Sequence, residues 1–437
     1  MSSPTSTPAM AENSSSLIRR SLRRARIVGN FTFVQGVVQA IGFLSGILIV
    51  RVLEQREYAY FTIANTMQGT INLLADIGIS VGLVSIGGRV WQNRDRFGEL
   101  INTALSLRKQ LGAIVILAVT PVMYFMLVKN GASFLYTAIL IAVVLIGLVF
   151  QLSIGVLGVI PRLRADVGRI QIIDFTGATV RLLLLSALVF VFLNAGIAVA
   201  VASAVSLLQY LMLRSYAAGV VDLGAPESED DRREIVRLTK HLAANSIFYC
   251  LQGQITVFLI SFFAHRTASI AEVGALGRLA MIFSVLTNLL TNIFVPAFAR
   301  CHDERKLRLL YGAIIGAVTA FSLTIVLGAW LFPDQFLFVL GNKYSHLHRE
   351  LLLMVGGAVL GALTGAFWSL NASKAWVGGA WLYIPLTLVI QIILIPYTNF
   401  ASVTGVLIFN LLSAIPNLLL NIVMSWRGFR SFQTVPA

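Results

Sequence analysis

The sequence predicts an all-α polytopic membrane protein with about twelve transmembrane helices, arranged as two lobes of six. Three observations predict this fold: apolar segments of membrane-spanning length recur along the chain, basic residues gather in every second gap between them, and the second half repeats features of the first. Because six is an even number, both halves enter the membrane in the same direction. The lobes are therefore expected to be related by a pseudo-two-fold axis along the membrane normal.

The apolar segments have the length of a membrane-spanning helix, which is about 20 residues for roughly 30 Å of hydrocarbon. Composition agrees, because 57% of the residues are hydrophobic and 12% are charged, whereas about a quarter are charged in soluble domains. A water-soluble core could not absorb this much apolar surface. The predicted spans are 27–50, 58–87, 105–128, 134–160, 172–193, 195–217, 241–264, 272–299, 309–331, 351–371, 375–396 and 400–425.

Most of the 33 lysine and arginine residues lie in the N-terminal tail and in every second gap between the spans. Basic loops stay on the cytoplasmic side of a membrane, so both termini are predicted to be cytoplasmic. The net charge of +14 is then explained by loops that face anionic lipid, and nucleic acid is not expected as a partner. The tail lacks the short apolar core and cleavage site of a secretory signal.

An internal repeat links the first two spans to the seventh and eighth. A shift of 215 residues superposes Asn30 on Asn245, Gln39 on Gln254, Arg51 on Arg266 and Glu57 on Glu272. Polar matches carry the weight, because apolar coincidences are common in membrane proteins. The expected organisation is a cytoplasmic basic tail (1–26), an N-lobe (27–217), a cytoplasmic linker (218–240), a C-lobe (241–426) and a cytoplasmic C-terminal tail (427–437).

Polar side chains form stripes on the four spans that the repeat relates. Such groups are costly against lipid, so the stripes must face protein or water. They either make hydrogen bonds between helices or line a cleft between the lobes, where transporters built from repeats bind their substrates. The residues predicted to line this cleft are Gln35, Gln39, Asn65, Gln68, Asn72, Asn245, Tyr249, Gln252, Asn288 and Asn292.

Charged residues inside the spans are the sharper signal. Arg181 and Arg278 each cost about 2.5–3.5 kcal/mol at a helix centre, so another interaction must offset that cost. One explanation is pairing with an intramembrane acid such as Asp76 or Asp174, and the other is binding of an anionic substrate. Asp76 itself is either an ion-coupling carboxylate or a counter-ion.

The sequence contains no catalytic constellation, so the protein is not expected to be an enzyme. A membrane glycan polymerase, ligase or glycosyltransferase would need a large outer loop or a soluble catalytic domain. Cys250 and Cys301 are too few for a thiolate metal site, and His346 and His348 are interpreted as polar surface of an outer loop. No metal or cofactor is expected.

Four segments carry a resemblance to a known family. They are Arg51-Val-Leu-Glu-Gln-Arg-Glu-Tyr-Ala-Tyr-Phe, Leu74-Ala-Asp-Ile-Gly-Ile-Ser-Val-Gly-Leu, Phe294-Val-Pro-Ala-Phe-Ala-Arg and Leu331-Phe-Pro-Asp-Gln-Phe-Leu-Phe-Val-Leu-Gly-Asn-Lys-Tyr. The chain resembles the polysaccharide exporters, or Wzx-like flippases, of the multidrug/oligosaccharidyl-lipid/polysaccharide (MOP) superfamily, over most of residues 27–426. It departs from them in having Tyr58-Ala-Tyr where a glycine is frequent.

The resemblance implies a MATE/MOP-like fold that flips a polyprenyl-diphosphate-linked oligosaccharide from the cytoplasmic to the outer leaflet of the cell inner membrane by alternating access. The product would serve O-antigen, exopolysaccharide or capsule synthesis, with membrane lipids and a polysaccharide polymerase or co-polymerase as partners. A diphosphate suits guanidinium groups, so Arg181 and Arg278 are the predicted diphosphate ligands, chosen by their burial. The rival is a cation-coupled drug or organic-cation exporter of the same fold, which Asp76 and Asp174 would suit.

Overall fold

A computed structural model describes residues 33–164, 166–189, 193–264, 266–301 and 303–432. Throughout these ranges the secondary structure is helical and contains no β-strand. Eleven helices are long and apolar enough to span a membrane, or twelve if the bent pair α2 and α3 is one span. The predicted all-α polytopic fold is thereby confirmed, while the basic tail 1–26 lies outside the described residues.

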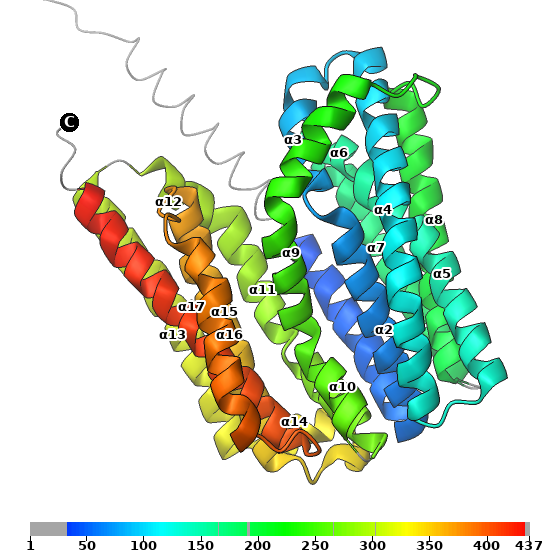
Figure 1. The fold of residues 1–437 in the computed structure, drawn as a ribbon, viewed down its shortest axis with the longest axis vertical. Helices are drawn as coiled ribbons and strands as arrows, with labels where there is room; N and C mark the ends of the chain where they lie inside the picture. Colours follow the sequence, from blue (N-terminus) through cyan, green and yellow to red (C-terminus); the bar gives the residue numbers. More distant parts are fainter. Residues whose placement is uncertain (1–32, 165, 190–192, 265, 302, 433–437) are drawn as a thin grey trace, which may run out of the picture.

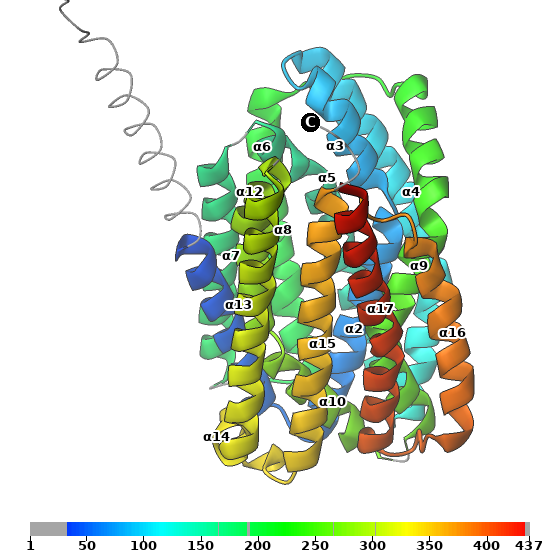
Figure 2. The ribbon, with the colours of Figure 1, turned by 90° about the vertical axis from the view of Figure 1, so that its left-hand side faces the viewer.

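The helices form two groups that lie side by side (Figures 1 and 2). The N-lobe contains the first helix Phe33–Val52, α2 (Gln55–Asp76), α3 (Ile79–Val90), α4 (Arg94–Lys129), α5 (Phe134–Leu157), α6 (Val159–Leu163), α7 (Val167–Val189) and α8 (Ala195–Val220). The C-lobe contains α10 (Ala268–Leu279), α11 (Ile282–Leu289), α12 (Val295–Arg300), α13 (Glu304–Leu331), α14 (Pro333–Leu340), α15 (His348–Ser373), α16 (Tyr383–Leu394) and α17 (Val403–Phe432), and α9 (Glu229–Phe263) lies between the groups.

The second span is not one straight helix. It breaks after Asp76, and α2 and α3 are bent by 45°. Gly78 has a φ of 84° at the break, a left-handed conformation that glycine adopts without steric cost. The break leaves Asp76 at the end of α2, close to the basic end of the molecule, by which we mean the end with α3, α6, α12 and the start of α9.

The eighth span also differs from the single helix predicted for 272–299. It consists of α10, α11, a π-helical turn Leu290–Phe294 and α12. Turns of this kind interrupt the regular hydrogen-bond ladder and change the direction in which side chains point. Arg278 lies at the end of α10 and Asn288 on α11, and the π-helical turn follows both.

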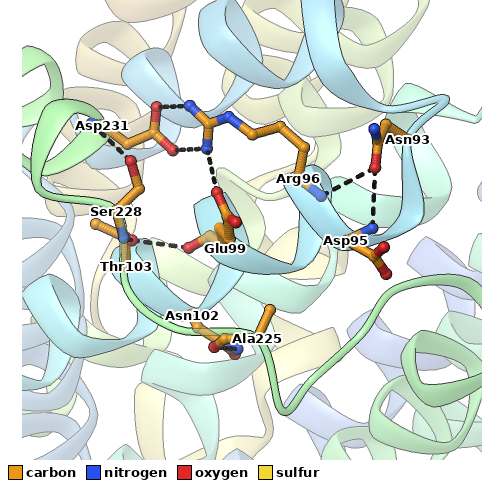
Figure 3. Close-up of polar contacts among 9 residues, drawn as sticks. All are labelled: Asn93, Asp95, Arg96, Glu99, Asn102, Thr103, Ala225, Ser228 and Asp231. Carbon is orange, nitrogen blue, oxygen red and sulfur yellow. Dashed lines mark hydrogen bonds and ion pairs between the residues drawn. The ribbon is translucent and has the colours of Figure 1, made fainter.

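Polar contacts hold the linker and the start of α9 to the N-lobe (Figure 3). Asp231 is 2% exposed and accepts two hydrogen bonds of 2.5 Å from the guanidinium of Arg96. The amide of Asn102 donates to the carbonyl oxygens of Leu223 and Ala225. The first part of α9, which falls within the predicted linker 218–240, is thus a helix packed on α4.

The hydrophobic cores show where the lobes meet. At the end opposite the basic end, one core combines residues of both lobes, among them Ile63 of α2 and Leu276 of α10. At the basic end, the N-lobe core around Phe97 and the C-lobe core around Phe298 are separate. The lobes therefore share a core at one end only, and their helices diverge toward the other (Figure 1).

Helices α2 and α10, which are related by the sequence repeat, make the close crossing at the shared end. A Cβ atom on Gly274 would lie 2.4 Å from the hydroxyl oxygen of Thr62, so the missing side chain permits this approach. Arg51 of the N-lobe donates a hydrogen bond to the carbonyl oxygen of Val339, and Lys343 of the C-lobe donates one to that of Leu53. The lobes are thus held together at the shared end by both apolar packing and hydrogen bonds.

Candidate substrate site between the lobes

Arg278 lies on the last turn of α10 and reaches from the C-lobe into the N-lobe. Its Nε donates to the hydroxyl of Tyr58 at 3.4 Å, and its guanidinium carbon lies 5.8 Å from the centre of the Phe61 ring. A Cβ on Gly46 would meet the Arg278 side chain at 3.4 Å, so the first helix passes close by. The arginine is half-buried and is held by aromatic groups of the other lobe.

Arg181 of α7 is the second intramembrane arginine and belongs to the N-lobe. Its Nε is buried and has no hydrogen-bond partner. Within the described ranges, neither arginine forms an ion pair. Two guanidinium groups without a protein counter-charge, in surroundings of low dielectric constant, favour an anion between or beside them.

Neither intramembrane acid forms an ion pair with Arg181 or Arg278 among the described residues. Asp76 pairs with Arg108, whose Nη1 lies 2.9 Å from Oδ1, and Arg108 also donates to the side-chain oxygen of Asn72 at 3.2 Å. Asp174 lines a cavity of about 130 Å³ together with Arg162. The described contacts therefore do not include an ion pair between Arg181 and either of these acids.

Arg108 is a functional candidate that the sequence reasoning missed. Arg108 lies near the start of the predicted third span, 105–128, and was not singled out there as an intramembrane charge. In the structure α4 already begins at Arg94, so Arg108 lies more than three turns inside the helix and is 5% exposed. The signal that could have revealed it is the N-cap at Asn93, whose side chain accepts from two backbone amides.

An apolar groove with a volume of about 450 Å³ runs beside Arg278. It lies between the first helix, the α10–α11 junction and the α14 region. Gln39 lies in this groove and accepts a hydrogen bond from Ser284 at 3.2 Å. It therefore joins two helices, which is one of the two roles expected for the polar stripes. The lining residues are Gly36, Gln39, Ala40, Phe43, Leu279, Met281, Ile282, Val285, Gln335, Phe336 and Val339.

A second cavity, also of about 450 Å³, lies inside the C-lobe between α9, α15, α16 and α17. Tyr249 and Gln252 line it, so two of the three predicted cleft residues of α9 are found here. Tyr249 stacks on Tyr383 with 4.8 Å between ring centres, and Gln252 exchanges hydrogen bonds with Gln391. The cavity combines apolar residues with several neutral polar side chains and has no charged residue in its lining.

The remaining predicted cleft residues are distributed over several positions. Asn65 is exposed on α2 although its neighbours in the chain are buried, and Asn245 is exposed on α9. Gln68 is buried, and its amide nitrogen lacks a partner among the described residues. Gln35 and Asn288 are half-buried, and the side chain of Asn292 lies outside the described part. The predicted cleft residues therefore do not lie in one place. Gln39 lies in the apolar groove, Tyr249 and Gln252 line the C-lobe cavity, and Asn72 bonds to Arg108.

Comparison with known proteins identifies structures that share this fold. No family model and no curated protein sequence matches the chain. Among solved structures, it is similar to the lipid II flippase MurJ in an inward closed conformation, with a TM-score of 0.70 and 10% identity over 92% of this chain and 89% of that one. The fold is that of the MOP superfamily transporters.

Two further structures support this assignment of the fold. An inward-facing multidrug resistance MATE transporter of the MOP superfamily matches with a TM-score of 0.63 and 16% identity over 91% of this chain and 96% of that one. A MOP superfamily transporter from Pyrococcus furiosus, described as having a binding pocket of reverse polarity, matches with a TM-score of 0.59 and 18% identity over 93% and 95% of the two chains. All three matches cover nearly the whole described fold, including both lobes.

Proposed function

We propose that this protein moves a polyprenyl-diphosphate-linked oligosaccharide from the cytoplasmic to the outer leaflet of the cell inner membrane by alternating access. The observation that carries the proposal is that Arg181 of α7 and Arg278 of α10, one in each lobe, form no ion pair among the described residues. A diphosphate offers several acceptor oxygens and a compact negative charge, which guanidinium groups bind with charge-assisted hydrogen bonds.

The apolar groove supports a lipid-linked substrate. It begins at Leu279, next to Arg278, and its other wall is the first helix. A polyprenyl chain is entirely apolar, so it would gain about 25 cal/mol for each Å² that it buries there. A diphosphate bound at the arginines could therefore keep its lipid tail in the adjoining groove.

The orientation supports loading from the cytoplasm. The basic end carries the arginines and lysines of the gaps that the positive-inside rule places in the cytoplasm. The lobes share a core only at the opposite end, so the described state corresponds to one that is closed toward the outside. In this orientation both termini are cytoplasmic, and a polymerase or co-polymerase would take up the product on the outer side.

The second candidate is a cation-coupled exporter of drugs or organic cations, because solved MATE structures share the fold. Such a substrate requires negative charge or aromatic faces in its site. Asp76 is neutralised by Arg108, and the arginine pair would repel a cation. The positive site beside the groove therefore favours the anionic, lipid-linked substrate.

The test replaces each arginine and follows transport in reconstituted vesicles. The probe is a polyprenyl-diphosphate-linked oligosaccharide, whose arrival in the far leaflet is read by accessibility to a glycosidase, with ethidium efflux measured in parallel. Loss of a charged hydrogen-bond donor costs about 1.5–3 kcal/mol, or roughly 10- to 150-fold. Arg181→Gln and Arg278→Gln should lose transport by this factor, and Lys variants should be intermediate because they keep the charge but not the planar fork.

The matched control is Arg266→Gln, which removes an exposed arginine at the shared end of the lobes and should transport normally. All variants are compared at equal folded amounts, judged by thermal unfolding. Normal glycolipid transport by both folded Gln variants would refute the anion site. Ethidium efflux without glycolipid transport by the parent protein would favour the exporter instead.

A further inference from the structure

We infer that the cavity inside the C-lobe is a binding site for an uncharged sugar unit of the transported glycan. The inference rests on the proposed function and extends it, because it assigns a separate position to the part of the substrate that the arginine pair does not hold. The cavity has a volume of about 450 Å³, which lies within the usual range of roughly 300–1,000 Å³ for small-molecule sites.

The lining has the chemistry of a neutral polar ligand. None of its residues is acidic or basic, yet it contains Gln252, Asn410, Ser413 and Asn417. The hydroxyl of Ser413 is buried and has no hydrogen-bond partner among the described residues, and such a group is costly unless a ligand or water satisfies it. Amides and hydroxyls both donate and accept hydrogen bonds, as sugar hydroxyl and N-acetyl groups do.

The amides are also arranged so that they remain available. Gln252 and Gln391 exchange hydrogen bonds of 3.2 and 2.8 Å, and Asn410 donates to Thr256 at 2.9 Å. Each of these bonds uses only part of the capacity of an amide, which has two donors and two acceptor lone pairs. The bonds fix the orientation of the amides and leave further donors and acceptors for a ligand.

Aromatic rings supply an apolar face within the same cavity. The rings of Tyr249 and Tyr383 stack with an angle of 22° between their planes, and Phe248 packs edge-on against Tyr383 at 5.3 Å. Tyr249 remains 41% exposed, so part of its side chain is open to a ligand. A sugar ring has one face of C–H groups and a rim of hydroxyls, which matches a rigid aromatic face beside polar groups.

The opposite wall of the cavity is left open by two glycines of α15. No protein atom lies within 4 Å of the position that a Cβ atom would take on Gly357 or Gly361. A larger residue at either position would enter the cavity and occupy volume that the structure keeps free. This gives a way to fill the cavity without disturbing the packing.

The location of the cavity agrees with the order of groups in the substrate. Ala280 lines the cavity and is two residues from Arg278, whereas Leu279 and Ile282 line the apolar groove. The α10–α11 junction therefore borders an apolar groove, a cationic position and a neutral polar cavity. A lipid-linked sugar has its apolar chain, diphosphate and glycan joined in the same order.

The lining does not fit a divalent cation. Calcium and magnesium sites are built around carboxylates, and no Asp or Glu is among the lining residues. Although the side-chain and backbone oxygens are polar, no negative charge compensates the dehydration of a divalent ion. The neutral sugar remains the ligand that the residues fit.

The experiment measures binding of two probes to the purified full chain in detergent. One probe is polyprenyl diphosphate, and the other is polyprenyl diphosphate that carries a single glucose or N-acetylglucosamine. The parent protein should bind a sugar-bearing probe about tenfold more tightly than the bare one. Gly361→Leu should abolish this difference without changing the affinity for the bare probe.

The matched control is Gly316→Leu, an exposed position on α13 where a Cβ also meets no atom, and it should keep the difference. Tyr249→Leu removes the ring face without adding volume and is the second test if Gly361→Leu does not fold. An unchanged tenfold difference in a folded Gly361→Leu or Tyr249→Leu variant would overturn the sugar site. Equal binding of all probes by the parent would overturn it as well, while failure of the parent to bind even polyprenyl diphosphate would refute the proposed function.

Discussion

Arg51 of the N-lobe and Lys343 of the C-lobe each bind backbone carbonyl groups of the opposite lobe. Arg51, at the end of the first helix, donates to the carbonyl oxygens of Val339 and Phe338 at 2.9 and 2.5 Å. Lys343 donates in return to the carbonyl oxygens of Arg51 and Leu53 at 3.2 and 2.8 Å. Each cation thus satisfies carbonyl groups near a helix C-terminus of the other lobe, where the last four have no partner within the helix.

The hydrogen bonds of Arg51 and Lys343 are predicted to hold the lobes together at the outer end. Lys343→Ala removes the bonds made by the lysine, so we expect a larger fraction of molecules to be open at this end. The measurement is the distance between spin labels at Phe134 and Tyr397, which are exposed on the two lobes at this end, in a background without the two native cysteines. The distance distribution should gain a longer component.

Arg349→Ala is the matched control for Lys343→Ala. Arg349 is an exposed basic residue at the same end, and no bond to the other lobe is found for it in the described ranges. The distance distribution of this variant should equal that of the parent. A Lys343→Ala distribution that is also unchanged would show that apolar packing alone keeps the lobes together.

The Asp76–Arg108 pair predicts a compensating double substitution. Asp76→Asn leaves the buried guanidinium of Arg108 without its counter-charge, and breaking a buried pair in this way typically costs about 3–5 kcal/mol. The exposure of Asp76 reduces this cost, since its side chain is 32% exposed. We expect a clear drop in melting temperature for Asp76→Asn and its recovery in Asp76→Asn/Arg108→Gln.

Transport by the recovered double variant separates the two roles of Asp76. If the carboxylate binds a coupling ion, the double variant folds but does not transport; if it is a counter-ion, both are restored. Asp334→Asn serves as the control, because this exposed acid pairs only with His348 among the described contacts. An Asp76→Asn protein as stable as the parent would contradict the structural importance of the pair.

The linker contacts predict a difference between a buried and an exposed ion pair on the same helix. Asp231 is buried against Arg96, whereas Glu234 pairs with Arg89 at 2.8 Å with both side chains largely exposed. Loss of a buried acceptor costs about 1–3 kcal/mol, and loss of a surface pair about 0–1 kcal/mol. Asp231→Ala should therefore expose residues 221–228 to protease much more than Glu234→Ala does. Equal protection of residues 221–228 from protease in both variants would contradict the role given to the Arg96–Asp231 ion pair.

The topology predicts which positions a membrane-impermeant thiol reagent reaches. Cysteines at Asp230 and Ser345, which are both exposed, are introduced one at a time into a protein without its native cysteines. Ser345→Cys should be labelled on intact cells and Asp230→Cys only after the inner membrane is permeabilised. The reverse pattern would invert the orientation on which the proposed direction of transport depends.

Sequence properties alone were sufficient to predict the class, the approximate spans, and Arg181 and Arg278 as charges inside the membrane. A bilayer imposes a minimum apolar length and a cost for every charge, so these properties can be read without knowing which helix packs on which. Arg181 and Arg278 were identified in this way, and the repeat placed Glu57 and Glu272 on α2 and α10, which cross at the lobe interface. The all-α fold followed from the same constraint, because a spanning helix satisfies its backbone hydrogen bonds internally.

Which polar groups contact one another could be learned only from the packing of the helices. Periodicity gives the face of a helix but not its neighbour, so Gln39 was grouped with cleft residues although it bonds to Ser284 in an apolar groove. Arg108 was not singled out because it lies only three residues after the predicted start of its span, whereas the cap at Asn93 starts α4 more than three turns before it. The break at Gly78 and the π turn in the eighth span change side-chain directions that a straight helix would keep. Contacts such as Arg51 with Lys343 join residues about 290 positions apart, and their partners are backbone carbonyls that no residue pattern marks.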